Sequence, residues 1–166
     1  MQEQNFVHFI NEILEEVHFR SFGILTFLNS RFRPPSAVTK YWEEIWEGDP
    51  ERRHWHKTPS TEWECVEQWM RDVDVHNYLC VHEPRGGDES RFHILVDLFG
   101  AFDDTARYRW KEISGGWALE RQLDDRIGRL IGHMVMRKGY PLTVRCGRFS
   151  GNYTREDFRP WRVESY

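Results

Sequence analysis

A glutamate and a histidine lie in the stretch that gives the clearest hairpin signal of this sequence. Residues 78–83 are rich in apolar, aromatic and β-branched side chains, and residues 91–99 alternate apolar with polar positions. These patterns predict two strands, and the Pro- and Gly-containing segment between them predicts a turn. If the strands pair, Glu83 at the end of the first and His93 near the start of the second face each other. A carboxylate and an imidazole placed in this way can hold a divalent cation such as Mg²⁺ or Mn²⁺.

The same two side chains also fit a cross-strand hydrogen bond or salt bridge without any metal. A metal site normally needs at least three protein ligands or a bound phosphate, and this pattern supplies two protein ligands. Both interpretations of the Glu83–His93 pair are therefore kept, and a structural pairing is the simpler of the two.

Length and composition indicate one globular domain that spans residues 1–166. No run of eighteen apolar residues is present, so we expect no membrane association. The first residues lack the basic and then apolar layout of a signal peptide. Cys65, Cys80 and Cys146 are widely spaced and form no CxxC motif, which is typical of reduced thiols. We therefore expect an intracellular, cytoplasmic protein.

The net charge of −4 is unevenly distributed along the chain. Acidic residues predominate up to about residue 104, and the remaining third is basic, Arg-rich and interleaved with aromatic residues. Arginines with aromatic neighbours suit single-stranded nucleic acid, because bases stack and phosphates pair with guanidinium groups. The candidate nucleic-acid-binding residues of this third are Arg107, Arg109, Arg145 and Arg148. Equally, the two oppositely charged parts could neutralise each other across the fold.

The remaining periodicities predict alternating helices and strands. An amphipathic helix is expected near residues 6–17, with Phe6, Ile10 and Ile13 on its apolar face. The other expected segments are a strand at 22–28, helices at 36–46 and 61–73, the hairpin, a polar connection at 100–116, a long helix at 117–138, a strand at 142–149 and an irregular tail. This order predicts an α+β fold, an antiparallel sheet of about four strands with helices packed on it in a ferredoxin-like, two-layer arrangement.

Several of these segments together resemble the nicking domain of HUH-type rolling-circle replication initiators, the Rep proteins of small plasmids and viruses. Residues 23–27, Gly-Ile-Leu-Thr-Phe, resemble the first-strand motif of that family, and residues 40–42, Lys-Tyr-Trp, lie in a helix at a suitable distance. Residues 78–83, the Arg-Gly-Gly turn and residues 91–96 resemble its metal-binding hairpin. The helix that ends near residue 138 takes the place of the helix that carries the nucleophile. The likeness covers roughly residues 20–150.

The resemblance implies binding and metal-dependent nicking of single-stranded DNA. Glu83 and His93 would hold Mg²⁺ or Mn²⁺, Lys138 would assist at the phosphate, and Tyr140 is the nearest candidate nucleophile. Two motifs are incomplete. Arg91 stands where the family pattern has a first histidine, and residues 117–138 contain no tyrosine. Arg91 could instead pair bidentately with a phosphate, which leaves a DNA-binding protein whose status as an enzyme is open.

Two further hypotheses come from other classes. An accessory protein could bind a partner protein through an aromatic, acidic surface, with Trp42, Trp46, Trp55 or Trp63 as anchors. A different metal-dependent nuclease would use a set of four histidines, which are His54, His56, His82 and His93.

Overall fold

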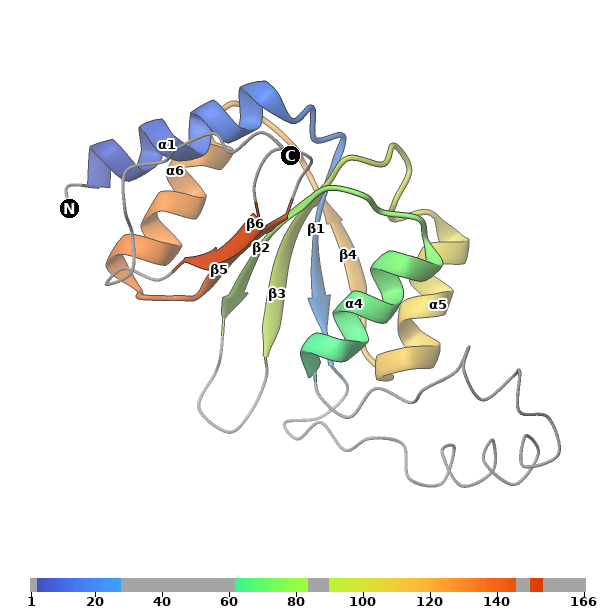
Figure 1. Ribbon diagram of the computed structural model, residues 1–166. Coiled ribbons are helices and arrows are strands. Elements are labelled where there is room, and N and C mark those ends of the chain that lie inside the picture. Colours follow the sequence, from blue (N-terminus) through green and yellow to red (C-terminus); the bar gives the residue numbers. More distant parts are fainter. Residues whose placement is uncertain (1–2, 28–61, 84–89, 146–149, 154–166) are drawn as a thin grey trace, which may run out of the picture.

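A six-stranded antiparallel sheet forms the centre of the protein in the computed structural model, which describes residues 3–27, 62–83, 90–145 and 150–153. The strand order is β4-β1-β3-β2-β5-β6 (Figure 1). The strands are β1 (Ser21–Thr26), β2 (Tyr78–Glu83), β3 (Arg91–Val96), β4 (Ala118–Arg121), β5 (Leu142–Arg145) and β6 (Ser150–Tyr153). The predicted hairpin is therefore present, and its second strand, β3, lies in the interior of the sheet between β1 and β2.

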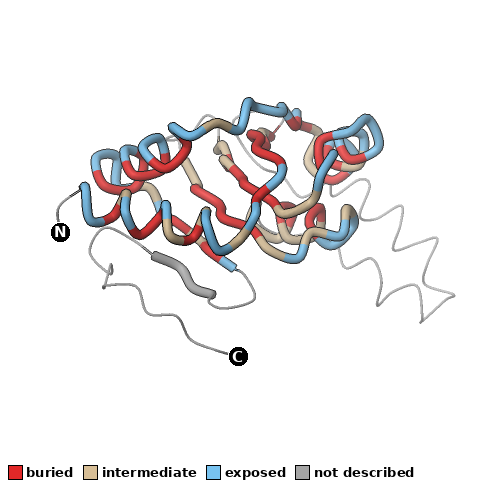
Figure 2. Tube along the Cα trace, turned by 90° about the horizontal axis from the view of Figure 1, so that it is seen from above, coloured by how far each residue is buried: buried red, intermediate tan, exposed pale blue. Residues whose placement is uncertain are grey.

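Helices cover both faces of this sheet (Figure 1). One face packs against α1 (Glu3–Glu16), α6 (Ile127–Gly132) and the π-helical turn η1 (His133–Arg137), which follows α6 directly. The opposite face packs against α4 (Glu62–Asp72) and α5 (Asp104–Ser114). Buried residues run along the strands between the two helix pairs, as the view from above shows (Figure 2). We call these the α1/α6 face and the α4/α5 face.

Alternation along the strands assigns each side chain to one face. On the α1/α6 face, Phe22, Leu79 and Leu95 join the core formed with α1 and α6. On the α4/α5 face, Leu25, Cys80, Phe92 and Ile94 join the second core. The expected amphipathic helix is α1, and its residues Phe6, Ile10 and Ile13 are fully buried in the first core.

Tight contacts fix β1 against the α4/α5 face. Gly23 leaves no room for a side chain, because an added Cβ would overlap the ring of Phe102. The buried indole of Trp110 in α5 donates a hydrogen bond to the carbonyl of Thr26 at 2.9 Å. Trp69 in α4 donates to the carbonyl of Ala106 in α5 at 2.9 Å, which joins the two helices. The end of β1 is thereby held in place.

The predicted α+β class, with an antiparallel sheet and helices packed on it, is confirmed. The strand count differs slightly, because the described residues form six strands instead of about four. Two of them were missed by sequence reasoning: β4 lies inside the predicted long helix, and β6 lies in the predicted irregular tail. The predicted helix at 36–46 lies outside the described residues.

The predicted connection at 100–116 was wrong, because most of it is helix α5. Asp103 caps this helix by accepting a hydrogen bond from the Ala106 amide, and Gly115 ends it with a left-handed conformation. The predicted helix at 117–138 was wrong in its first part, where β4 pairs with β1. Leu119 and Leu123 in this segment stand at helical spacing in the sequence, but both side chains are exposed. Only from Ile127 onward does the chain enter α6.

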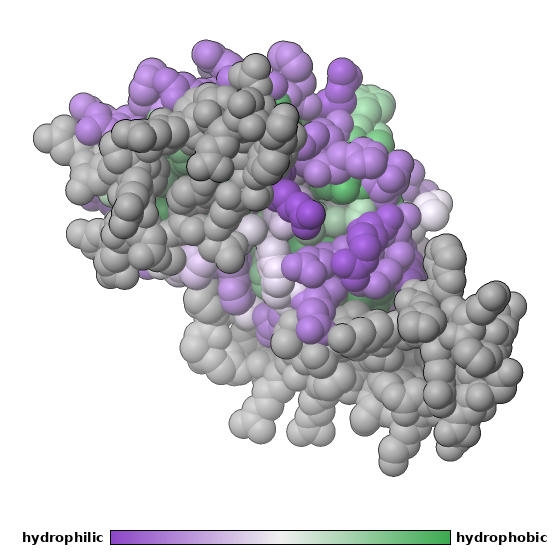
Figure 3. Space-filling model, in the orientation of Figure 1, coloured by the Kyte–Doolittle hydropathy of each residue, from purple (hydrophilic) through white to green (hydrophobic). Residues whose placement is uncertain are grey.

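Among the described residues, no helix combines the length and the apolar character needed to cross a membrane. The described surface in the view of Figure 3 is largely hydrophilic.

Candidate functional site

Glu83 and His93 are in direct contact on the α1/α6 face. In the β2–β3 register His93 stands opposite Val81 and Glu83 stands opposite Arg91, so the two side chains are diagonal neighbours on one face. Their Nε2 and Oε2 atoms are 2.8 Å apart. The side chains are only 13% and 15% exposed. The pairing expected from the sequence is therefore present, at the end of the hairpin.

The hydrogen bond defines which nitrogen of His93 carries a proton. An ionised carboxylate only accepts hydrogen bonds, so Nε2 donates to Glu83 when the ring is neutral. The other nitrogen, Nδ1, is then an acceptor. It is buried and has no hydrogen-bond partner among the described residues.

Positive charge surrounds this pair. Burial lowers the pKa of His93 below its ordinary value of 6.5, the hydrogen bond and charge of Glu83 oppose this shift, and the charges of Arg91 and Arg121 add to it. Arg91 is next to Glu83 across the strands, and Arg121 lies on β4 on the same face. His93 is therefore largely neutral at pH 7, and the charges of Arg91 and Arg121 act on its ring together with the charge of Glu83.

The described side chains supply only part of a cation site. Glu83 and His93 provide two donors, and no group of three His, Cys, Asp or Glu residues that could hold a metal occurs in the described ranges. A histidine that binds a metal also normally donates its second N–H to an acceptor, whereas Nδ1 of His93 has none among these residues. The donor set thus fits Mg²⁺ or Mn²⁺ only if another group, such as a phosphate oxygen, completes it.

Tyr140 lies on the same face and at the same end of the sheet as this pair. Its partly buried side chain packs against the α1/α6 core. The carbonyl of Pro141 accepts a hydrogen bond from the His82 amide at 3.1 Å, which extends the β2–β5 pairing beyond Leu142. Tyr140 is therefore level with Glu83. Lys138 is exposed two residues earlier, where η1 ends.

The candidate nucleic-acid-binding arginines are spread over both faces. Arg91 adjoins Glu83, whereas Arg107 and Arg109 project from α5 on the opposite face. Arg109 forms ion pairs with Asp72 at 2.6 Å and Glu112 at 3.0 Å, and Arg107 lies 4.0 Å from Glu120. Arg145 pairs with Tyr78 at the other end of β2. Arg148 lies outside the described residues. The structure brings only Arg91 to the Glu83–His93 pair.

The four histidines of the alternative nuclease do not converge. His82 lies on the α4/α5 face, stacked on Phe92 with ring centroids 4.3 Å apart, and its Nε2 is 3.3 Å from Ser90 Oγ. Burial lowers the pKa of His82, which the charge of Glu62 opposes. His82 and His93 are therefore separated by the sheet. His54 and His56 lie outside the described residues.

Sequence reasoning missed a cavity on the α1/α6 face. About 530 Å³ in volume, it lies between the end of β4 and α6, and its lining includes Phe22, Arg121, Arg129 and Leu130. The signal was present as three arginines at positions 121, 126 and 129. It was overlooked because this segment was assigned to the long helix.

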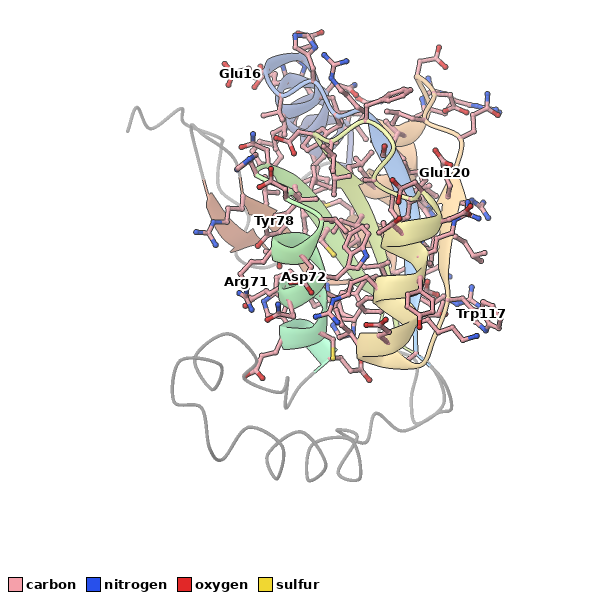
Figure 4. All side chains as sticks on the ribbon, turned by 90° about the vertical axis from the view of Figure 1, so that its right-hand side faces the viewer. Glu16, Arg71, Asp72, Tyr78, Trp117 and Glu120 are labelled. Atoms are coloured by element: carbon pink, nitrogen blue, oxygen red, sulfur yellow. The ribbon has the colours of Figure 1, made fainter. Side chains whose placement is uncertain are left out.

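Trp117 and Leu119 are further exposed apolar residues near the site. Trp117 is held against Thr26 by a backbone hydrogen bond of 2.9 Å, and its side chain, 62% exposed, projects away from the body of the protein (Figure 4). Leu119 is 52% exposed and stands opposite Ile24, which in turn stands opposite His93. Of the anchors expected for a partner protein, Trp63 packs against the α4/α5 core, and Trp42, Trp46 and Trp55 lie outside the described residues.

Comparisons of this chain with protein-family models, with curated proteins and with solved structures gave no match.

Proposed function

We propose that this protein binds single-stranded DNA on the α1/α6 face of its sheet, as a Rep-like protein of plasmid or viral type. One observation carries the proposal: the hairpin that resembles the metal-binding hairpin of Rep proteins brings Glu83 and His93 within 2.8 Å of each other in a partly buried position. Neither residue is needed there for the apolar core, since both lie beyond the core residues Val81 and Leu95 on their strands.

The charges around the pair support a phosphate group as the ligand. Arg91 stands opposite Glu83, Arg121 acts electrostatically on His93, and a guanidinium group binds phosphate in a bidentate manner. Neutral His93 adds no charge of its own, so a phosphate at this position would meet the positive charges of Arg91 and Arg121. This arrangement favours a DNA backbone over a free cation.

Nicking is the further activity that this site would support if a cation binds together with the DNA. The cation would polarise the scissile phosphate, with Glu83 and His93 as its protein ligands. The phenol oxygen of Tyr140 would form a bond to phosphorus, the bond from phosphorus to the leaving hydroxyl of the DNA would break, and Lys138 would stabilise charge at the phosphate. The position of Tyr140 level with Glu83 supports this assignment.

A gel experiment tests both parts of the proposal. The protein is incubated with a labelled single-stranded oligonucleotide of mixed sequence, with Mn²⁺ or with EDTA, at low and moderate salt, and analysed on native and denaturing gels. We expect a salt-sensitive shift in EDTA. Metal-dependent cleavage or a covalent adduct lost in Tyr140→Phe would establish nicking as well.

His93→Ala is the diagnostic variant, and His82→Ala is its matched control. Both histidines are partly buried at the same end of the sheet and have lowered pKa values, but they lie on opposite faces. In Mn²⁺, where His93 would be a ligand of the cation that binds the phosphate, His93→Ala should weaken the shift and His82→Ala should preserve it. No shift of the wild-type protein at low salt would refute the proposal.

Binding of a partner protein is the alternative function. The exposed aromatic residues Tyr108 and Trp117 support it, since such side chains are common anchors in interfaces. It becomes the leading proposal if the wild-type protein does not shift single-stranded DNA.

A further inference from the structure

Two arginines in the cavity between β4 and α6 have no carboxylate partner among the described residues. They are Arg121 and Arg129, both exposed on the cavity wall. Arg126, also on the wall, is 3.5 Å from Asp124, the one carboxylate of the lining. The lining therefore has a surplus of positive charge, and a volume of about 530 Å³ suits a small organic group with its charged substituent.

The lining of this cavity also has an apolar part. Phe22 and Ile127 in this lining are buried, and Leu130 is 42% exposed. Proteins bind single-stranded nucleic acid with arginines beside aromatic and aliphatic side chains, because the phosphates pair with the guanidinium groups and the bases pack on the apolar surface. The chemistry of the lining thus matches one nucleotide unit.

The strand register relates the cavity to the Glu83–His93 pair. Arg121 stands opposite Phe22, Leu119 stands opposite Ile24, and Ile24 stands opposite His93. Arg121 is therefore two strands across the sheet and one side-chain row along it from His93, which corresponds to about 12 Å between Cα atoms. All these side chains are on the same face, and Leu119, which is half exposed, lies between the two sites.

We propose that this cavity is a second nucleotide-binding site, which holds the continuation of the single strand whose phosphate lies at Glu83 and His93. The single-stranded DNA then crosses the edge of the sheet over Leu119, and Arg121 and Arg129 bind the phosphates of the DNA. This inference rests on the proposed function, and it specifies the path of the DNA on the protein.

Oligonucleotide length tests this path. Fluorescence anisotropy compares single strands of about 4 and about 12 nucleotides, within the range of site sizes of small single-strand-binding domains. The wild-type protein should bind the longer strand roughly 10-fold more tightly than a short strand that occupies one site. In Arg126→Glu/Arg129→Glu, two cavity residues that take no part in the first site, this ratio should fall towards one, while the affinity for the short strand changes about twofold or less.

Matched variants separate this inference from the proposed function. Arg71→Glu/Arg107→Glu makes the same change in net charge on the α4/α5 face and should retain the length ratio. In Mn²⁺, where His93 would be a ligand of the cation at the first site, His93→Ala should weaken the binding of both oligonucleotides and retain the ratio. Arg126→Gln/Arg129→Gln, a milder change, guards against misfolding, which circular dichroism would reveal.

The outcomes are distinct. An unchanged length ratio in both cavity variants would overturn the second site and leave the proposed function intact. If the cavity variants lose binding to both oligonucleotides and His93→Ala has no effect on binding in Mn²⁺, the two-site path is overturned, because all binding would then take place in the cavity. Absence of binding by the wild-type protein would overturn the proposed function and this inference together.

Discussion

At the scale of single residues, the contact between Glu83 and His93 was predicted from the sequence and is present in the structure. The period-2 pattern indicated which residues of each strand share a face, and the β2–β3 register agrees with it. The surroundings could not be read from the sequence. Arg121 is far from both residues along the chain, and only the pairing of β4 with β1 brings it to this face.

Glu83→Gln separates a phosphate-binding pair from a cation site. Without metal, loss of the carboxylate removes a negative charge beside the DNA phosphate, worth about 1 kcal/mol or roughly fivefold in affinity. We therefore expect Glu83→Gln to bind single-stranded DNA more tightly in EDTA, measured by anisotropy. Weaker binding in EDTA would show that the carboxylate supports the site in another way, while a loss of any Mn²⁺-dependent cleavage would fit its role as a ligand.

The neutral state of His93 predicts how stability depends on pH. The folded protein holds the pKa of His93 below the ordinary value of 6.5, so the unfolded chain binds the proton more strongly. Stability should therefore be full above about pH 6.5 and decrease as the pH falls through the lowered pKa. His82, also with a lowered pKa, contributes in the same direction.

Urea unfolding between about pH 7 and pH 5, a window that spans the ordinary histidine pKa, measures this effect. His93→Gln, which cannot be protonated, should show a smaller loss of stability than the wild-type protein across the window. An identical loss in both proteins would contradict the burial of a neutral His93.

At the scale of elements, the helices and strands with regular apolar periodicity were predicted from the sequence. Those that depend on helix caps or on pairing at the edge of the sheet were not predicted. The hairpin strand at residues 78–83 and the helix α1 were predicted because their apolar residues are frequent and regularly spaced. Helix α5 buries only Ala106, Trp110 and Ile113. The sequence signals for this helix were Asp103, which caps its N-terminus, and Gly115, which ends it. Strand β4 has mostly exposed residues at the sheet edge, so no alternation marked it.

Trp110 in α5 should be a main determinant of stability. Its ring is fully buried against Phe27 at a centroid distance of 5.2 Å, and its indole N–H satisfies the Thr26 carbonyl. Trp110→Phe leaves that carbonyl without its donor and creates a small cavity, which should cost about 2–4 kcal/mol in the free energy of unfolding. Trp117→Phe, at an exposed position, is the control and should cost under about 0.5 kcal/mol. Equal losses in urea unfolding would contradict the assignment of Trp110 to the core.

At the scale of the whole molecule, the sheet divides the basic residues of the last third of the chain into two groups. On the α4/α5 face Arg107 and Arg109 are close to carboxylates, whereas on the α1/α6 face Arg121 and Arg129 line a cavity. The sequence alone showed that this third of the chain is basic. Which arginines lie on which face depends on β4, which pairs with β1 at the edge of the sheet and connects α5 on one face with α6 on the other. Figure 4 shows the outer side of α4 and α5, where Arg71 and Asp72 lie.

Hydrogen exchange with and without single-stranded DNA should show that one face is used. We expect added protection in β3, β4 and α6, and little change in α4 and α5, because Arg121 and Arg129, which have no carboxylate partner among the described residues, line the cavity on the α1/α6 face. Protection centred on α5 would instead point to Arg107 and Arg109 as the binding residues.

The most direct measurement is the equilibrium affinity of the full chain for a fluorescent single-stranded oligonucleotide, in EDTA, as a function of salt. With Arg91, Arg121 and Arg129 near the backbone, the logarithm of the association constant should fall with the logarithm of the salt concentration with a slope of about −2, at roughly 0.7 per phosphate contact. A wild-type protein that shows no binding even at low salt would contradict the account.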